Sequence, residues 1–229
     1  DGQEQRRRCR YRKEVLSALR AAAKIPEHFL GKGAWGAVEY ERLPSRCRLL
    51  YGSSVYGKRD QGRYVAHLVR AAREAIKGSS GKGVKATAIL PHELTEKAQA
   101  RLAQPTTKTK RGRRERLEAG KVARLEENLL WLAQVQACQQ ARRKGGQGLM
   151  VPVCDVSGSM HGTPMAVAVA LSLLLAESAP KHSPWHGKMF TFHTRPSLVT
   201  VPGIPTLEGL DDEGLSVDAL LARVGDVGE

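Results

Sequence analysis

Three oxygen-bearing side chains stand at alternate positions in one short loop: Asp155, Ser157 and Ser159. Gly158, between the two serines, allows a tight turn in which the three side chains converge. A ligand set made only of oxygens suits a hard cation, Mg²⁺ above all, because thiolate and imidazole donors are absent from these positions. One carboxylate offsets only half of a divalent charge, so the open coordination position is expected to attract an acidic group from a partner. The loop therefore predicts ligand capture more than catalysis.

The same loop is expected to join a buried strand to a helix. The apolar run over residues 150–154 predicts a parallel strand that ends at Asp155. Thr163 is expected to be the N-cap of a helix whose first residue is Pro164 and which continues to Ala176. Further elements are expected as a strand over 188–192, an edge strand over 198–201 and a helix over 216–224.

The five residues Asp155-Val156-Ser157-Gly158-Ser159 resemble the D-x-S-x-S metal-ion-dependent adhesion site of von Willebrand factor type A domains, as in integrins and the Ro ribonucleoprotein. The resemblance covers roughly residues 148–224, read against the doubly wound α/β pattern that those domains share. It implies an α/β Rossmann-like fold for this part of the chain, Mg²⁺ as cofactor and an acidic protein ligand as partner.

Other segments resemble an uncharacterised family of plants, fungi and giant viruses that joins a helical domain to such an A domain. The matching segments are Trp35 with Tyr40-x-Arg42-x-Pro44-Ser45, Leu90-Pro91-His92-Glu93, Val153 to Met160, Gly162 to Met165, and Pro184-Trp185-x-Gly187-Lys188. The layout is similar to that of the Ro protein, whose helical ring binds RNA. The resemblance therefore implies RNA as an alternative partner, in a ribonucleoprotein.

A complete A domain has about six strands, and its metal site takes a threonine from a second loop and an aspartate from a third. The resemblance places both of these ligands beyond Glu229. We therefore expect the chain to hold an incomplete A domain in which Mg²⁺ is weakly held, because this ion gives up its water reluctantly. Thr191, Thr194 and Asp211 are not assigned as substitutes, since they fall on the expected strand and its flanks.

The loop and the glycine-rich segments also have other interpretations. The loop alone could be an Asx or Ser turn that caps a helix. A phosphotransferase of the haloacid dehalogenase type would need a second Asp where Ser157 stands, and neither serine lies in the G-x-S-x-G of a hydrolase. Residues 31–38 fit the kinase pattern G-x-G-x-x-G-x-V, but no H-R-D or D-F-G follows, and Gly81-Lys82 lacks the remainder of a Walker A motif. No enzyme is predicted.

Charge divides the chain into two regions. Residues 1–150 hold 33 Lys and Arg against 14 Asp and Glu, a net of +19, whereas residues 151–229 hold 4 against 9, a net of −5. A basic region favours nucleic acid or another anionic surface as partner. The alternative is that the Arg-rich composition only keeps these helices soluble. The candidate RNA contacts lie in an apolar-poor stretch: Lys108, Lys110, Arg111, Arg113, Arg114 and Arg116.

The expected organisation has four parts. A basic helical region (1–98, with helices over 11–24 and 63–77 and after Pro91) leads into a basic disordered linker or insertion (99–118), then a helix (119–147), then the α/β part (148–229). Four scattered cysteines form no zinc or disulfide pattern, and no apolar stretch reaches the ~20 residues of a membrane span. A cytoplasmic protein without a membrane partner is expected, the nucleus being the alternative.

Overall fold

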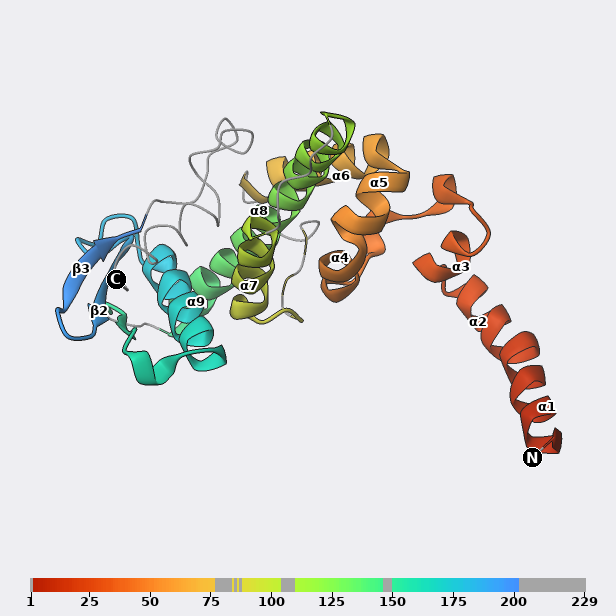
Figure 1. The fold of residues 1–229 in the computed structure, drawn as a ribbon, viewed down its shortest axis with the longest axis horizontal. Helices are drawn as coiled ribbons and strands as arrows, with labels where there is room; N and C mark the ends of the chain where they lie inside the picture. The colour runs from red at the N-terminus through yellow and green to blue at the C-terminus, as the bar shows by residue number, and fades with distance from the viewer. Residues whose placement is uncertain are drawn as a thin grey trace. The chain divides into compact units, whose positions relative to one another are not determined.

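The computed structural model describes residues 2–76, 84, 86, 88–103, 110–145 and 150–201 (Figure 1). The chain divides into two compact units, Asp1–Leu43 and Pro44–Glu229. The described residues are mainly helical, and the second unit adds a small mixed sheet of three strands. None of the described helices is both long and apolar enough to cross a membrane.

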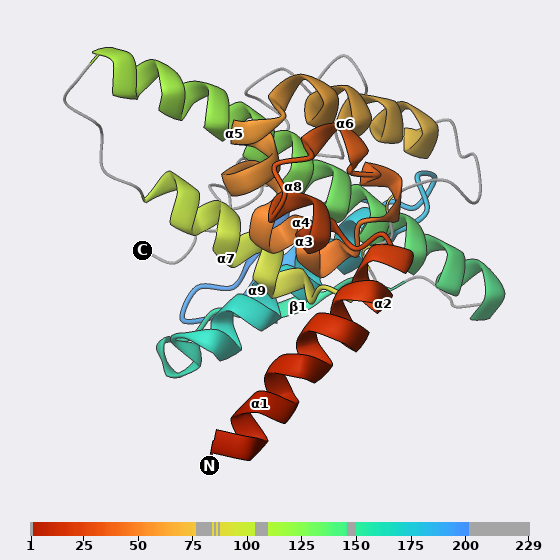
Figure 2. The same ribbon diagram turned by 90° about the vertical axis from the view of Figure 1, so that its right-hand side faces the viewer.

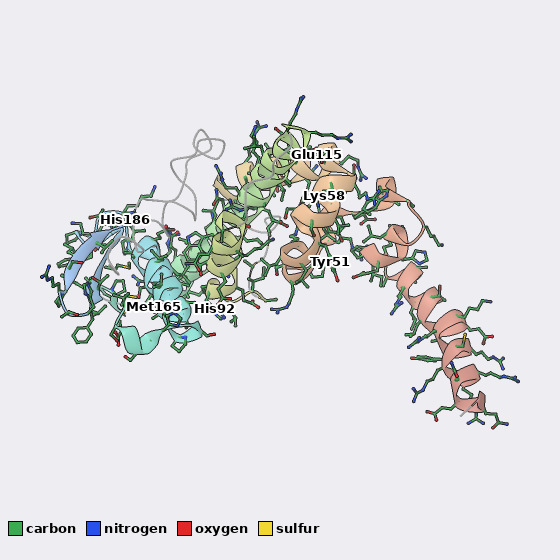
Figure 3. All side chains as sticks on the ribbon, viewed as in Figure 1. Tyr51, Lys58, His92, Glu115, Met165 and His186 are labelled. Carbon is green, nitrogen blue, oxygen red and sulfur yellow. The ribbon has the colours of Figure 1, made fainter. Side chains whose placement is uncertain are left out.

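The first unit is built from short helices. They are α1 (Gly2–Tyr11), a π-helical stretch (Arg12–Leu16), α2 (Ser17–Ala22), α3 (Pro26–Leu30) and two 3₁₀ turns (Trp35–Ala37 and Tyr40–Arg42). The first three follow one another without a break, so the helix begins at Gly2 and not at Tyr11 as the apolar spacing predicts. Arg, Gln and Glu are good helix formers, and Glu4 pairs with Arg8 at 2.6 Å one turn away. Side chains project from α1 on all sides (Figure 3), and none of them is buried.

The second unit carries most of the helices. They are α4 (Ser45–Tyr51), the π-helical stretch η4 (Gly52–Tyr56), α5 (Gly57–Arg59), α6 (Gln61–Ile76), α7 (Pro91–Leu102), α8 (Lys110–Gly145) and α9 (Thr163–Ser178). Helices α6 and α7 confirm the helix expected over 63–77 and the helical start at Pro91. The backbone N–H of Leu90 donates to the Glu93 carboxylate at 2.9 Å, which satisfies one of the free groups at the start of α7.

Most described residues of the expected disordered linker over 99–118 are helical, and Ala103 lies in a turn after α7. Helix α7 continues to Leu102 and α8 begins at Lys110, while residues 104–109 lie outside the described residues. The expectation of disorder was therefore wrong for residues 110–118. The segment is poor in apolar residues, but its Arg, Lys and Glu favour helix, and it continues into a packed helix that stabilises it.

The sheet consists of β1 (Val153–Asp155), β2 (Lys188–Phe192) and β3 (Ser197–Thr200) in the order β1-β2-β3. Strands β1 and β2 are parallel with α9 between them in the chain, and β3 is antiparallel to β2. Cys154, Met189 and Val199 are buried on the face that α9 covers, whereas Val153 and Leu198 of the opposite face are exposed. Within the described residues the sheet thus has helical cover on one face, and a complete doubly wound fold is not seen.

One hydrophobic core joins the helices to this sheet. Its larger members are Leu94 of α7, Leu130, Trp131 and Val135 of α8, Leu173 of α9 and Met189 of β2. Helices α6 and α8 also lie side by side (Figure 2), as do α7 and α9. The sequence predicts a boundary between residues 147 and 148, where the helical part meets the α/β part, but the two sides of that boundary share this core. The division by contacts falls at Leu43 and Pro44 instead.

Candidate metal centre

The loop that carries the three predicted ligands begins where β1 ends. Asp155 is the last residue of β1 and lies opposite Phe192, the last residue of β2. The backbone N–H of Val156 donates to the carbonyl of Phe192 at 3.0 Å, which fixes the start of the loop to the neighbouring strand. Because β1 and β2 are parallel, their carboxyl ends lie at the same edge of the sheet, where ligand sites of α/β proteins form.

The three predicted side chains are brought together by hydrogen bonds within the loop. The Asp155 Oδ1 atom accepts from the backbone N–H of Ser157 at 2.9 Å, and the Oγ atoms of Ser157 and Ser159 lie 3.0 Å apart. A 3₁₀ turn over Gly158–Met160 places Ser159 beside Ser157. The loop therefore offers one carboxylate and two neighbouring hydroxyls, a set of hard oxygen donors that fits Mg²⁺.

Hydrogen bonding keeps the carboxylate of this loop charged. The side chain of Ser157, and then its backbone N–H, hold the pKa of Asp155 below its ordinary value of 3.8, while slight burial acts in the opposite direction. Asp155 is therefore ionised at neutral pH, as a cation ligand must be. The described residues contain no group of three or more His, Cys, Asp or Glu that could hold a metal ion.

Helix α9 starts one residue earlier than the sequence suggested. Gly162, with a φ of 90°, is the residue before the helix, Thr163 is its first residue and Pro164 its second. The expected N-cap role of Thr163 is therefore wrong, and no side chain caps this end. A φ in this region favours glycine, so Gly162 turns the chain sharply from the loop into the helix.

Two further features position the loop. The Cys154 thiol hydrogen-bonds with Ser172 of α9, and burial, the larger effect, raises the pKa of that thiol, so the residue next to Asp155 is an inert part of the core. Before β2, the turn at Gly187 has a φ of 66°, and its N–H donates to the carbonyl of Ala176 at 3.0 Å. The resemblance segment around Trp185 thus ties β2 to the end of α9.

The structure describes two of the three residues that were not assigned as metal ligands. Thr191 is buried and its Oγ1 bonds with Ser197 Oγ at 2.9 Å, on the covered face and away from the loop. Thr194 is exposed, and Asp211 lies outside the described residues. His193 directly follows β2, at the edge of the sheet that carries Asp155.

The candidate RNA contacts lie at the start of α8, except for Lys108, which is outside the described residues. Arg111 and Arg114 are exposed, and Arg111 pairs with Glu115 at 3.0 Å. Lys110, Arg113 and Arg116 belong to the same helical turns. Figure 3 shows Glu115 near this end of α8.

A family model described as Domain of unknown function (DUF2828) matches residues 2–141, which is more than half of the 229 residues. The chain belongs to the DUF2828 family. In this DUF2828 protein, residues 150–216 also match a second family model, described as Domain of unknown function (DUF7788). The metal loop therefore lies in the DUF7788 match, and the two matches meet near the boundary drawn from the sequence, even though both sides share one core.

The DUF2828 protein also resembles a viral protein described as "Uncharacterized protein L728" of Acanthamoeba polyphaga mimivirus. The two are 50% identical over 56 residues, which make up 24% of this chain and 9% of the viral protein. The two family matches and the giant-virus relative agree with the expected uncharacterised family, and none of them is to a von Willebrand factor A domain. No solved structure matches.

Proposed function

We propose that this DUF2828 protein is a binding protein that captures an acidic group of a partner protein through Mg²⁺ held by Asp155, Ser157 and Ser159. The main support is the convergence of one ionised carboxylate and two hydroxyls, with 3.0 Å between the hydroxyl oxygens, at the carboxyl end of a parallel strand. Mg²⁺ would supply the positive charge that an acidic ligand needs. Asp155 is the only charged group among the three ligands, which supports binding more than catalysis.

We also propose that the sheet carrying this site is the first half of a von Willebrand A-like sheet. A doubly wound sheet has the order 3-2-1-4-5-6, and ligands bind where that order reverses, next to strand 1. The described order β3-β2-β1, with α9 connecting the parallel strands β1 and β2, fits the strand order of the first half of that pattern, although β3 is antiparallel to β2. Under this proposal Asp155 stands at the point of reversal, and further ligands come from neighbouring loops.

Removal of the Asp155 charge is expected to abolish Mg²⁺ binding. Asp155→Asn keeps an oxygen that can accept from the Ser157 N–H, so the loop is preserved while the charged ligand is lost. Isothermal titration with Mg²⁺ alone should give weak binding for the wild type and no detectable heat for Asp155→Asn. Because the pKa of Asp155 is lowered, binding should persist as the pH falls from neutral to about 5.

The matched control is Glu118→Gln, which removes one exposed carboxylate from α8. It should bind Mg²⁺ as the wild type does. If Asp155→Asn and Glu118→Gln both bind like the wild type, the metal proposal is wrong. A second titration with a short glutamate-rich peptide, with and without Mg²⁺, tests the acidic ligand separately, and equal binding in both cases would contradict metal-mediated capture.

RNA binding through the start of α8 is the second candidate. Five cations, Lys110, Arg111, Arg113, Arg114 and Arg116, crowd the first two turns of this helix. The N-terminal end of a helix is already the positive end of its dipole, so this arrangement costs free energy in the isolated protein. A polyanion at this end would meet the exposed side chains of Arg111 and Arg114 together with the helix dipole, which favours phosphate as the partner.

Loss of two of these cations is expected to weaken RNA binding and its dependence on salt. For a double variant, Arg111→Gln with Arg114→Gln, the logarithmic salt slope should fall by ~0.7 for each lost contact with a single-strand phosphate. The control pair, Arg143→Gln with Lys144→Gln, removes the same charge from the exposed C-terminal end of α8. Fluorescence anisotropy of a short labelled RNA over a salt series provides the measurement, and equal slopes for the two double variants would contradict this candidate.

A further inference from the structure

A buried carboxyl group lies between α8 and α9 and has no role in the proposed metal site. Glu177 is in the last turn of α9 and is 2% exposed. Its Oε2 accepts a hydrogen bond from the indole Nε1–H of Trp131, on α8, at 2.9 Å. Trp131 is also 2% exposed. The contact joins residues that are 46 positions apart in the chain and lies inside the common core.

The second oxygen of this carboxyl group has no hydrogen-bond donor among the described residues. Glu177 Oε1 is buried without a hydrogen-bond partner there. Among the cationic groups of the surrounding elements, Lys97 and Arg101 of α7 face Glu126 and Glu127. Arg142 of α8 donates from one terminal nitrogen to the Leu175 carbonyl at 3.5 Å, and its Nε is buried without a partner among the described residues. A buried carboxylate that lacks a cation is costly, whereas a neutral carboxylic acid is not.

Other titratable groups lie on the elements around this contact. Cys138 of α8 donates to Ser178 Oγ at 3.2 Å, and His186, labelled in Figure 3, donates from Nδ1 to the Ala179 carbonyl at 2.8 Å. On the strands that α9 covers, Cys154 bonds with Ser172, Asp155 bonds with Ser157 and Lys188 is in the first position of β2. Among the described residues, Trp131 is the hydrogen-bond partner that affects the pKa of Glu177.

Burial makes the carboxyl group hold its proton to unusually high pH. Burial raises the pKa of Glu177 to about 7 from its ordinary value of 4.5, and the Trp131 hydrogen bond only partly offsets this effect. A group with a raised pKa in the packed state binds its proton more tightly when packed than when exposed. The packed state is therefore favoured most below about pH 4.5, and this advantage is lost as the pH rises to about 7, above which no further loss occurs.

We infer that Glu177 is a proton-sensitive contact that controls how firmly α8 and α9 pack together. With the proton bound, the neutral carboxyl accepts from Trp131 and the two helices are closely packed. With the proton released, the core holds a negative charge that has no cation partner among the described residues, and the helices separate more often. Helix α8 lies mostly in the DUF2828 match and α9 in the DUF7788 match, so the contact regulates the coupling between the two regions.

Hydrogen exchange of α8 and α9, with protection normalised for the intrinsic pH dependence of exchange, tests this inference in the full chain. Between about pH 5 and pH 8, opening of the α8 and α9 amides in the wild type should increase by on the order of 10²-fold, the size set by the difference between the two pKa values. Glu177→Gln, which keeps an oxygen for the Trp131 N–H but cannot ionise, should show a nearly flat profile. Glu118→Gln, the exposed control on α8, should behave as the wild type.

The wild type alone can overturn the inference, since unchanged normalised protection of α8 and α9 between these pH values would show that the contact is insensitive to protons. Equal pH profiles for the wild type and Glu177→Gln would also overturn it, because the titrating group would then lie elsewhere. If Glu177→Gln is poorly folded, a Trp35→Phe, Trp185→Phe variant, in which Trp131 is the remaining fluorophore, gives a second measurement. A fluorescence transition between about pH 5 and pH 7 supports the inference, and its absence contradicts it.

Discussion

Gly52→Ala is expected to destabilise the second unit by about 3–5 kcal/mol, the cost of breaking a buried charged network. A Cβ atom at position 52 would overlap the whole carboxylate of Glu126 on α8. That carboxylate is 0% exposed, so it cannot move into solvent. It accepts a hydrogen bond from the hydroxyl of Tyr64 on α6 at 2.5 Å and one from the backbone N–H of Ser53, and Lys97 Nζ on α7 lies 3.6 Å from its Oε2.

This network explains the size of the expected effect. Burial raises the pKa of Glu126, while Lys97, the Tyr64 hydroxyl and Arg48 act against burial and favour the charged form. Displacement of the carboxylate would remove these compensating interactions and leave the cost of burial. Since the net stability of a domain is only about 5–15 kcal/mol, the loss would remove a large part of it.

Urea unfolding followed by circular dichroism measures the change. The control is Gly120→Ala, within α8, where an added Cβ has nothing within 4 Å. It should be neutral or stabilising by up to about 1 kcal/mol, because alanine favours helix. If overlap with Glu126 is the cause, Gly52→Ala should cost little when added to Glu126→Ala. Full additivity of the two substitutions would contradict that explanation.

Leu173→Ala is expected to destabilise the helical and the sheet parts together, by about 2–5 kcal/mol. Leu173 of α9 is 0% exposed and belongs to the core that also contains Leu130 of α8 and Met189 of β2. A cavity at this position removes contacts on both sides of the boundary between the family matches. The two parts should therefore unfold in one transition that moves to lower urea concentration.

Leu171→Ala is the matched control, since Leu171 is on the same helix but 45% exposed. Its cost should be much smaller, because the substitution leaves no enclosed cavity. Hydrogen exchange separates the outcomes. Loss of protection in both α8 and β2 for Leu173→Ala agrees with a shared core, and loss confined to β2 would show that the two family regions fold independently.

Short-range patterns in the sequence were sufficient to predict the strand, loop and helix that form the candidate site. Strand β2 has the predicted bounds, and Asp155 ends β1 as expected. The ligands stand within five consecutive residues, so their proximity follows from chain geometry and Gly158 alone. Two predictions from local sequence were wrong. The N-cap of α9 is Gly162 and not Thr163. The basic segment from Lys110 is helical and not disordered, because charged residues can also favour helix.

By itself, the sequence determined the candidate ligands, the helical character of the first part and the unequal charge of the two regions, since these depend on residue type and short spacing. The tertiary structure alone decided that both sides of the predicted boundary share one core, that Glu126 lies against Gly52, and that Glu177 meets Trp131. Apolar periodicity shows that a helix face is buried but not which element covers it. Contacts such as Tyr64 with Glu126, 62 positions apart, exist only because α6, α7, α8 and α9 pack together, and burial then shifts the ionisation of side chains that would be ordinary in the unfolded chain.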